Sequence, residues 1–440
     1  MSDRYVVLGL ARVRSTWFRE VSRWATSAAV PIDFVKCMSV DEVRAHLASG
    51  RAFSALVLDA GLPAIDRDLV GLARDLGSAV ILVEHGTVAR DLDSLGIAAV
   101  LPHTFDRDDL LRILAEHASP VGATPSLPSA RPAGLRPDPH APRARVVAVT
   151  GAGGTGTSIV AMALARGLAE RGQGAGEVLL ADLALDADQA MLHDARDIVP
   201  SVQELTDAYR HGGLDQQQLR AMTFGEGHAY RVLLGLRRHR DWTALRARAW
   251  YAALDELRCA FTTVVADIDP DLEGEAQCGS LDVEERNLLA RSITTVADVV
   301  VVTGLPGVHG VHRLVRVLDG LVAHGVPADR LVPVINRAPR SPRARAELSR
   351  ALAELARPML GAQHELLAGP VFVGDQRRLD AALRDGVGAP TTMSTLVAGA
   401  VEALLARVDA PTISLADEVP VAVTPGSLGS WADADLGGPP

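Results

Sequence analysis

The chain has 440 residues, of which 48% are hydrophobic and 22% charged, a composition typical of a globular protein with room for two domains. Its net charge of −10 argues against a general nucleic-acid binder, because neutralising phosphates requires clustered positive charge. The sequence has three scattered cysteines, Cys37, Cys259 and Cys278, which we expect to be reduced thiols. It shows no signal-peptide pattern and no apolar run near the roughly 20 residues of a spanning helix. We therefore predict a cytoplasmic protein with no transmembrane segment.

The amino-terminal part alternates strand-like and helix-like runs. Helix candidates include Ser15–Ala25, opened by a Ser cap, and Val40–Leu47, and the alternation predicts a parallel α/β sheet of flavodoxin-like order. The predicted strands are Tyr5–Leu10, Ile32–Cys37, Phe53–Asp59, Ala79–Val83 and Ala98–Leu101.

One of these strands resembles the phospho-acceptor strand of response-regulator receivers. The segment Leu56–Pro63 places Asp59 at the acceptor position. Receivers need two acids after the first strand to bind Mg²⁺, and Gly9–Ala11 stands there instead; Glu84 and His103 fall where a Thr and a Lys are needed. Phosphoryl transfer to Asp59 would lack charge neutralisation. We therefore expect a pseudo-receiver that docks partners or mediates self-association.

Two segments are predicted to have no fold of their own. Residues 119–143 hold seven prolines among small residues and read as a linker. Residues 411–440 form an acidic tail that we expect to be disordered. The predicted layout is a pseudo-receiver domain (1–118), the linker, a P-loop domain (144–410) and the tail.

A glycine-rich stretch at Thr150–Ser158 is the most informative part of the chain. Gly151, Gly156 and Ser158 have the spacing of a phosphate-binding loop. The loop follows an apolar strand, Val146–Val149, and leads into a helix-like run, Ile159–Leu168. Glycines allow backbone N–H groups to face phosphate oxygens, and the serine hydroxyl can bind Mg²⁺.

The lysine of such a loop is missing. Thr157 occupies its position, and the only lysine of the chain is Lys36. Because this lysine adds charge over the terminal phosphates, we expect nucleotide binding with slow turnover. The alternative is a glycine-rich turn that binds no ligand.

Two later strands end in acids. Val178–Asp182 and Thr263–Asp267 are apolar runs with a terminal Asp. Asp267 is a Walker B candidate that would hold the water shell of Mg²⁺. Taken alone, such a pattern also fits an ordinary strand end.

The rest of the chain continues the α/β pattern. Strands are predicted at Ala297–Val302, Leu331–Arg337 and Val371–Asp375, with helices from Gly307 to Leu321 and over Arg377–Leu383. The last helix candidate, Leu396–Val408, carries one basic residue, Arg407. This favours packing against the core over binding to an anionic membrane. Its apolar face is Val397, Val401, Leu404 and Leu405.

Two basic stretches have alternative interpretations. Leu236–Trp242 contains Arg237, Arg238 and Arg240 and could supply the charge missing at Thr157. We favour a solvated loop or a docking site for an acidic partner. Arg337–Arg345 could contact DNA, but a solvated loop and helix start is the expected structure.

The ordered set of motifs resembles the MinD/ParA group of P-loop ATPases over roughly residues 144–408. These proteins carry the loop Lys-Gly-Gly-x-Gly-Lys-Thr/Ser, and the stretch 152–158 looks like it with both lysines replaced, by Ala152 and Thr157. The CpaE/TadZ branch is similar in tolerating lysine-poor loops. The septum-site-determining proteins of actinobacteria are similar in carrying Leu-Arg-Arg-His-Arg-Asp-Trp, found here at 236–242.

The resemblance implies roles for individual residues. Asp182 matches the first acid of the family's switch segment, a possible catalytic position, while the second acid falls on Ala184. Ser158 and Asp267 would bind Mg²⁺ through the nucleotide. Asn336 would recognise the adenine base, and Asp375 lies in the segment that would close the base pocket. The implied phosphate-binding residues are Gly151, Gly153, Gly154, Thr155, Gly156, Thr157 and Ser158.

Together these features predict an ATP- and Mg²⁺-binding spatial regulator that forms a homodimer and recruits assembly proteins. The family resemblance leaves septum-site placement and pilus or secretion assembly equally open. The alternatives are a slow ATPase that uses a substitute arginine and a nucleotide-free scaffold of the same fold. Any recruitment to the membrane, pole or septum is expected to occur through partners.

Overall fold

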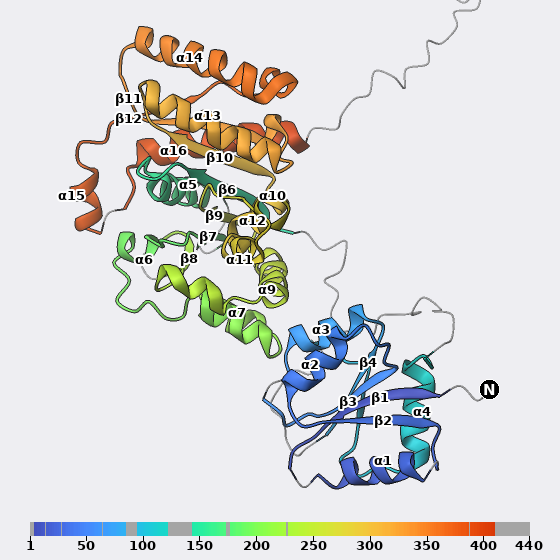
Figure 1. Cartoon of the computed structure of the whole chain (residues 1–440). Coiled ribbons are helices and arrows are strands. Elements are labelled where there is room, and N and C mark those ends of the chain that lie inside the picture. Colours follow the sequence, from blue (N-terminus) through green and yellow to red (C-terminus); the bar gives the residue numbers. More distant parts are fainter. Residues whose placement is uncertain are drawn as a thin grey trace, which may run out of the picture.

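The computed structural model describes residues 4–13, 15–27, 29–63, 65–84, 95–121, 143–172, 177–225, 228–386 and 388–409. Most of the predicted linker (122–142) and the predicted tail (411–440) lie outside these ranges. We call residues 4–121 the first domain and residues 143–409 the second domain. Each contains its own parallel sheet (Figure 1).

The sheet of the first domain has the order β2-β1-β3-β4-β5, the flavodoxin-like order predicted from the sequence. Helices α2 and α3 pack on one face, and α1 and α4 on the other. Ser15 precedes α1 as predicted, but its side chain makes no capping hydrogen bond. The elements are β1 (Tyr5–Leu10), α1 (Thr16–Thr26), β2 (Ile32–Cys37), α2 (Val40–Ala48), β3 (Ala55–Asp59), α3 (Arg67–Asp75), β4 (Ala79–Val83), β5 (Ala99–Leu101) and α4 (Arg107–His117).

The second domain contains a sheet of seven parallel strands in the order β12-β11-β10-β6-β9-β7-β8. The strands are β6 (Arg145–Gly151), β7 (Val178–Asp182), β8 (Arg231–Leu233), β9 (Thr263–Asp267), β10 (Val299–Gly304), β11 (Leu331–Ala338) and β12 (Val371–Gly374). Because all strands run the same way, the segments after β6, β7 and β9 meet at one carboxyl edge. This edge contains the glycine loop and both predicted acids.

Helices cover both faces of this sheet, which explains why its strands are apolar on both sides. Helices α5 and α16 share one core cluster, while α7, α9, α12 and α13 belong to the other. The helices are α5 (Thr157–Arg171), α6 (Gln189–Leu192), α7 (Val202–Arg210), α8 (Gln216–Ala221), α9 (Ala247–Ala260), α10 (Glu275–Cys278), α11 (Leu281–Arg286), α12 (Leu288–Val296), α13 (Val308–Ala323), α14 (Pro342–Leu360), α15 (Leu379–Arg384) and α16 (Thr391–Asp409), with short 3₁₀ turns η2 (His239–Ala244), η3 (Ala328–Arg330) and η4 (Gly361–Glu365).

Helix α16 packs against α5, as its apolar face predicted. Val397 and Val401 are fully buried, and Leu404 is buried beside them. Among the helices of the described ranges, none combines the length and apolarity needed to cross a membrane.

Candidate functional site

The loop between β6 and α5 has the backbone geometry of a phosphate cradle. Gly154 and Gly156 have φ angles of 80° and 83°, in the left-handed region that glycine adopts without steric cost. A Cβ at Gly156 would lie 2.6 Å from Nδ2 of Asn336. Glycine is therefore required there both by conformation and by space.

The outer side of the loop is open. Cβ atoms placed on Gly153 and Gly154 would meet nothing within 4 Å, and both residues are exposed. The loop leads directly into α5, a helix of 15 residues, whose first N–H groups have no partner within the helix. This arrangement suits an anion at the start of α5.

Thr157, at the position of the missing lysine, bonds within the loop. Its Oγ1 lies 3.1 Å from Oγ1 of Thr155, and the Thr155 hydroxyl in turn donates to the carbonyl oxygen of Ala152 at 2.8 Å. The two hydroxyl groups stiffen the loop but add no positive charge.

Asn336 holds the loop from the neighbouring side. Its Nδ2 donates to the carbonyl oxygen of Thr155 at 2.9 Å, and its Oδ1 accepts from the backbone N–H of Arg337 at 2.9 Å. Arg337 has a φ of 52°, at an irregularity between β11 and β12. The amide therefore braces the loop, and adenine reading by Asn336 stays a prediction.

The two predicted acids stand side by side. Asp182 and Asp267 are register partners at the ends of β7 and β9, and both are buried. Gln189 connects them: its backbone N–H donates to Asp182 Oδ2 at 2.8 Å, and its Nε2 donates to Asp267 Oδ2 at 2.9 Å.

The same glutamine joins the acids to the glycine loop. Gln189 Nε2 also donates to the carbonyl oxygen of Ser158 at 3.0 Å, and the Ser158 side chain lowers the pKa of Asp267. Gln189 thus links the predicted metal pair, Ser158 and Asp267.

Burial dominates the electrostatics of this pair. Desolvation and the nearby charge of Asp267 raise the pKa of Asp182 well above its ordinary value. Desolvation also raises the pKa of Asp267 to about 6, although hydrogen bonds from Gln189 and Ser158 oppose the shift. Two adjacent buried carboxylates repel each other, so a cation placed beside them would stabilise their charged form.

Several buried oxygens at this edge have no hydrogen-bond partner among the described residues. They are Asp182 Oδ1, Gln189 Oε1, Thr150 Oγ1 and Thr303 Oγ1. Strands β6 and β10 pair at Thr150 and at Gly151, opposite Val302 and Thr303, so both hydroxyls flank the start of the loop. Carboxylate and hydroxyl oxygens are ligands that Mg²⁺ and its water shell accept, and the site therefore fits a nucleotide-bound Mg²⁺.

One predicted site residue lies apart from the others. Asp375 is exposed after β12, which is separated from β6 by β11 and β10. Within the part of the chain that the structure describes, Asp375 makes no hydrogen bond or ion pair with the loop. Its role in closing a base pocket stays a prediction.

The arginine-rich segment 236–242 is partly held by its neighbours. Arg237 donates to Gln203 Oε1 at 3.0 Å and lies 3.3 Å from a Glu204 oxygen. His239 Nδ1 lies 3.1 Å from Asp186 Oδ1, whereas Arg238 is exposed. The contacts of Arg237 hold the segment against α7, and compensation by Arg238 stays an untested alternative to the solvated loop that we favour.

Sequence reasoning missed Gln189 and Asp269. Asp269 is partly buried, accepts from the backbone N–H of Leu185 at 2.7 Å, and has a pKa raised by desolvation. Its position two residues after Asp267 was an available signal. Gln189 lies in no recognisable motif, so only the fold reveals its bridging role.

The acid of the first domain has a different environment. Asp59 is buried, and its Oδ1 accepts from the backbone N–H of Gly61 at 3.0 Å. The guanidinium of Arg12 donates to the carbonyl oxygen of Gly61. A cation of the chain itself therefore lies against the segment that follows Asp59.

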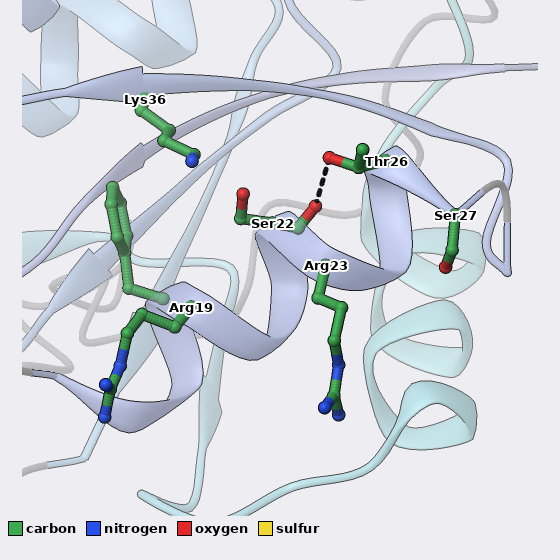
Figure 2. Close-up of a pocket in the computed structure, with 7 residues that line it drawn as sticks. Arg19, Ser22, Arg23, Thr26, Ser27 and Lys36 are labelled. Atoms are coloured by element: carbon green, nitrogen blue, oxygen red, sulfur yellow. Dashed lines mark hydrogen bonds between the residues drawn. The ribbon is translucent and has the colours of Figure 1, made fainter.

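A groove of about 530 Å³ lies on the first domain between α1 and β2. Figure 2 shows Arg19 and Arg23 extending from α1 away from Lys36. These cations do not converge on one point, and the groove lies on the sheet face opposite α3. It is separate from the loop and acids of the second domain.

No protein-family model matches the sequence, and no curated protein matches it. Among solved structures, the chain is similar to a ParA family ATPase from Chlorobium tepidum, with 14% identity, a TM-score of 0.41 and coverage of 60% of this chain and 96% of that one. It is also similar to the septum site-determining protein MinD from Pyrococcus horikoshii complexed with Mg-ADP (16%, 0.41, 61% and 96%). A third similar structure is apo McdA from Cyanthece (16%, 0.40, 60% and 97%).

Proposed function

We propose that the chain binds ATP with Mg²⁺ and acts as a spatial regulator of the MinD/ParA kind, organising septum-site placement or pilus or secretion assembly. One observation carries nucleotide binding: a buried acid pair lies beside an open glycine loop, and Gln189 links it to the loop's Ser158. The regulatory role rests on the resemblance of the loop, the two acid-ending strands and the 236–242 segment to that group.

The roles of the residues follow from their positions. Main-chain N–H groups of residues 151–158 would hold the phosphates, and Ser158 and Asp267 would hold the water shell of Mg²⁺. Bound Mg²⁺ would neutralise phosphate charge and the charge of the acid pair. Asn336 keeps the loop in place, and together with Asp375 it lies on the side proposed for the base.

Slow or absent turnover is part of the proposal. Thr157 supplies no charge, and Ala184 stands where the family has its second acid. The nucleotide would then act as a conformational ligand that shifts a monomer–homodimer equilibrium by binding one state more tightly. Partner proteins of the division or assembly machinery would recognise the nucleotide-bound state.

Calorimetry with ATP, ADP and GTP in the presence of Mg²⁺, combined with a phosphate-release assay, tests the proposal. We expect ATP binding with negligible phosphate release. Release that Asp267→Ala abolishes would instead identify a slow ATPase. No binding of any nucleotide at millimolar concentration would leave a scaffold that keeps only the fold.

A further inference from the structure

Helix α3 of the first domain lies against α7 and α9 of the second domain (Figure 1). Arg67, the first residue of α3, donates from Nε to the carbonyl oxygen of Tyr209 at 2.9 Å and from Nη2 to that of Gly212 at 2.7 Å. The last carbonyls of a helix lack partners within it and attract cations. An arginine of one domain therefore caps a helix of the other.

The neighbouring Asp66 adds a charged contact in the opposite direction. This carboxylate is 1% exposed. Its Oδ1 accepts from the N–H of Leu69 and so caps α3, while its Oδ2 accepts from Arg210 Nε at 3.0 Å and Nη2 at 2.8 Å. A buried carboxylate depends strongly on such a partner, so these contacts make domain docking specific.

A third contact lies at the rim of the same interface. Arg248 on α9 donates to Asp75 on α3 at 2.6 Å, and both side chains are partly exposed. Because neither group is enclosed, their charges can be exchanged without leaving a buried ion unpaired. This pair therefore offers a rescue experiment.

The other end of α7 reaches the acid pair. The N–H of Val202 donates to the carbonyl oxygen of Leu234 at 2.8 Å. At the next residue, Gly235, a Cβ would lie 2.8 Å from the carbonyl oxygen of Asp182 and 2.9 Å from its Cγ. The segment that follows β8 therefore packs directly on the acid.

Side chains strengthen this second connection. Glu204, in the first turn of α7, accepts from Ser201 and lies 3.3 Å from Arg237. Arg237 belongs to the 236–242 segment, whose His239 contacts Asp186, four residues after Asp182. A rigid helix of nine residues therefore joins the domain interface at one end to the acid-bearing segment at the other.

We propose that docking of α3 on α7 holds the 182–189 segment in place, so that the first domain controls the acid pair through α7. The effect on nucleotide affinity rests on the proposed function, whereas the control of the segment does not. Coupling is reciprocal: a ligand that holds the acid pair also tightens domain docking.

Hydrogen exchange and calorimetry on the full chain test this inference. In Arg210→Glu a carboxylate faces Asp66, and we expect exchange at residues 182–192 and 234–242 to accelerate about tenfold or more without nucleotide. We expect Mg-ATP to bind about fivefold more weakly, a typical coupling between sites. Arg343→Glu, which breaks an exposed pair with Glu347 on α14, is the matched control and should change neither.

Variants of the rim pair, Asp75 and Arg248, distinguish a loss of domain docking from misfolding. Asp75→Arg and Arg248→Asp should each accelerate exchange in both segments, and the double variant should restore wild-type exchange. Faster exchange confined to α3, α7 and α9, with 182–192 unchanged, would overturn the inference even if ATP binds. Faster exchange at 182–192 in a protein that binds no nucleotide would sustain the control of the segment and refute only the proposed function.

Discussion

Buried aspartates lie at the carboxyl edges of both sheets, but the groups around them differ. In the first domain, Asp59 accepts a backbone N–H and Arg12 lies beside it, bonded to Gly61. In the second domain, Asp182 and Asp267 are buried together, with an Asp182 oxygen that has no partner among the described residues. One edge has a cation of the chain close to its acid, whereas the two acids of the other edge make no ion pair with any described residue. This difference is why we propose the edge of the second domain as the ligand site.

The largest expected effect comes from removing the acid that Gln189 links to Ser158. Asp267→Asn should weaken Mg-ATP binding about 30-fold or more, because a hydrogen bond to a charged group contributes about 2 kcal/mol. Asp59→Asn is the matched control on the other sheet and should leave affinity unchanged. Calorimetry on both variants checks this, and equal affinities in the two would break the comparison.

The second effect concerns the conformation of the loop. Gly156→Ala should lower the free energy of unfolding by about 2 kcal/mol, because a left-handed alanine is strained and its Cβ would displace Asn336. Gly153→Ala, which meets no atom, should be nearly neutral. Chemical denaturation of both variants measures the difference. A Gly156→Ala variant as stable as wild type would show that the loop does not need this geometry.

Thr157→Lys sharpens the comparison of the two domains by adding a cation at the carboxyl edge of the second domain's sheet. Restoring the charge should tighten ATP binding about tenfold, or ~1.4 kcal/mol, and it removes the hydroxyl pair with Thr155. Thr157→Gln, which has similar length but no charge, should not tighten binding. Equal ATP affinities of the two variants would contradict the prediction that a positive charge at position 157 tightens binding.

The smallest effect is the pH dependence of stability. A carboxyl group whose pKa is raised on folding contributes stability at pH below its unfolded pKa, and this contribution is lost as pH rises through its folded value. For Asp267 that window runs from about 4 to the folded value of about 6. Asp267→Asn should therefore gain stability relative to wild type as pH rises from 4 to 7. Thermal denaturation across this range checks the sign, and a constant difference would contradict it.

Most strands and the glycine loop could be predicted from the sequence, because buried parallel strands are continuous apolar runs and the loop needs glycine at fixed spacing. Contacts between distant segments could not be predicted. Gln189 bridges two acids only because β7 and β9 are neighbours in the sheet. Likewise, Arg67 and Tyr209 are 142 residues apart in the sequence, and no local sequence pattern predicts their hydrogen bond.

The central claim is that a loop without lysine still binds a nucleotide because the acid pair behind it binds Mg²⁺. The most direct test is the affinity of the wild-type protein for ATP, measured by calorimetry with Mg²⁺ and then with a chelator. We predict that Mg²⁺ tightens binding about tenfold or more. Equal affinity under both conditions, or no binding in either, would contradict the account.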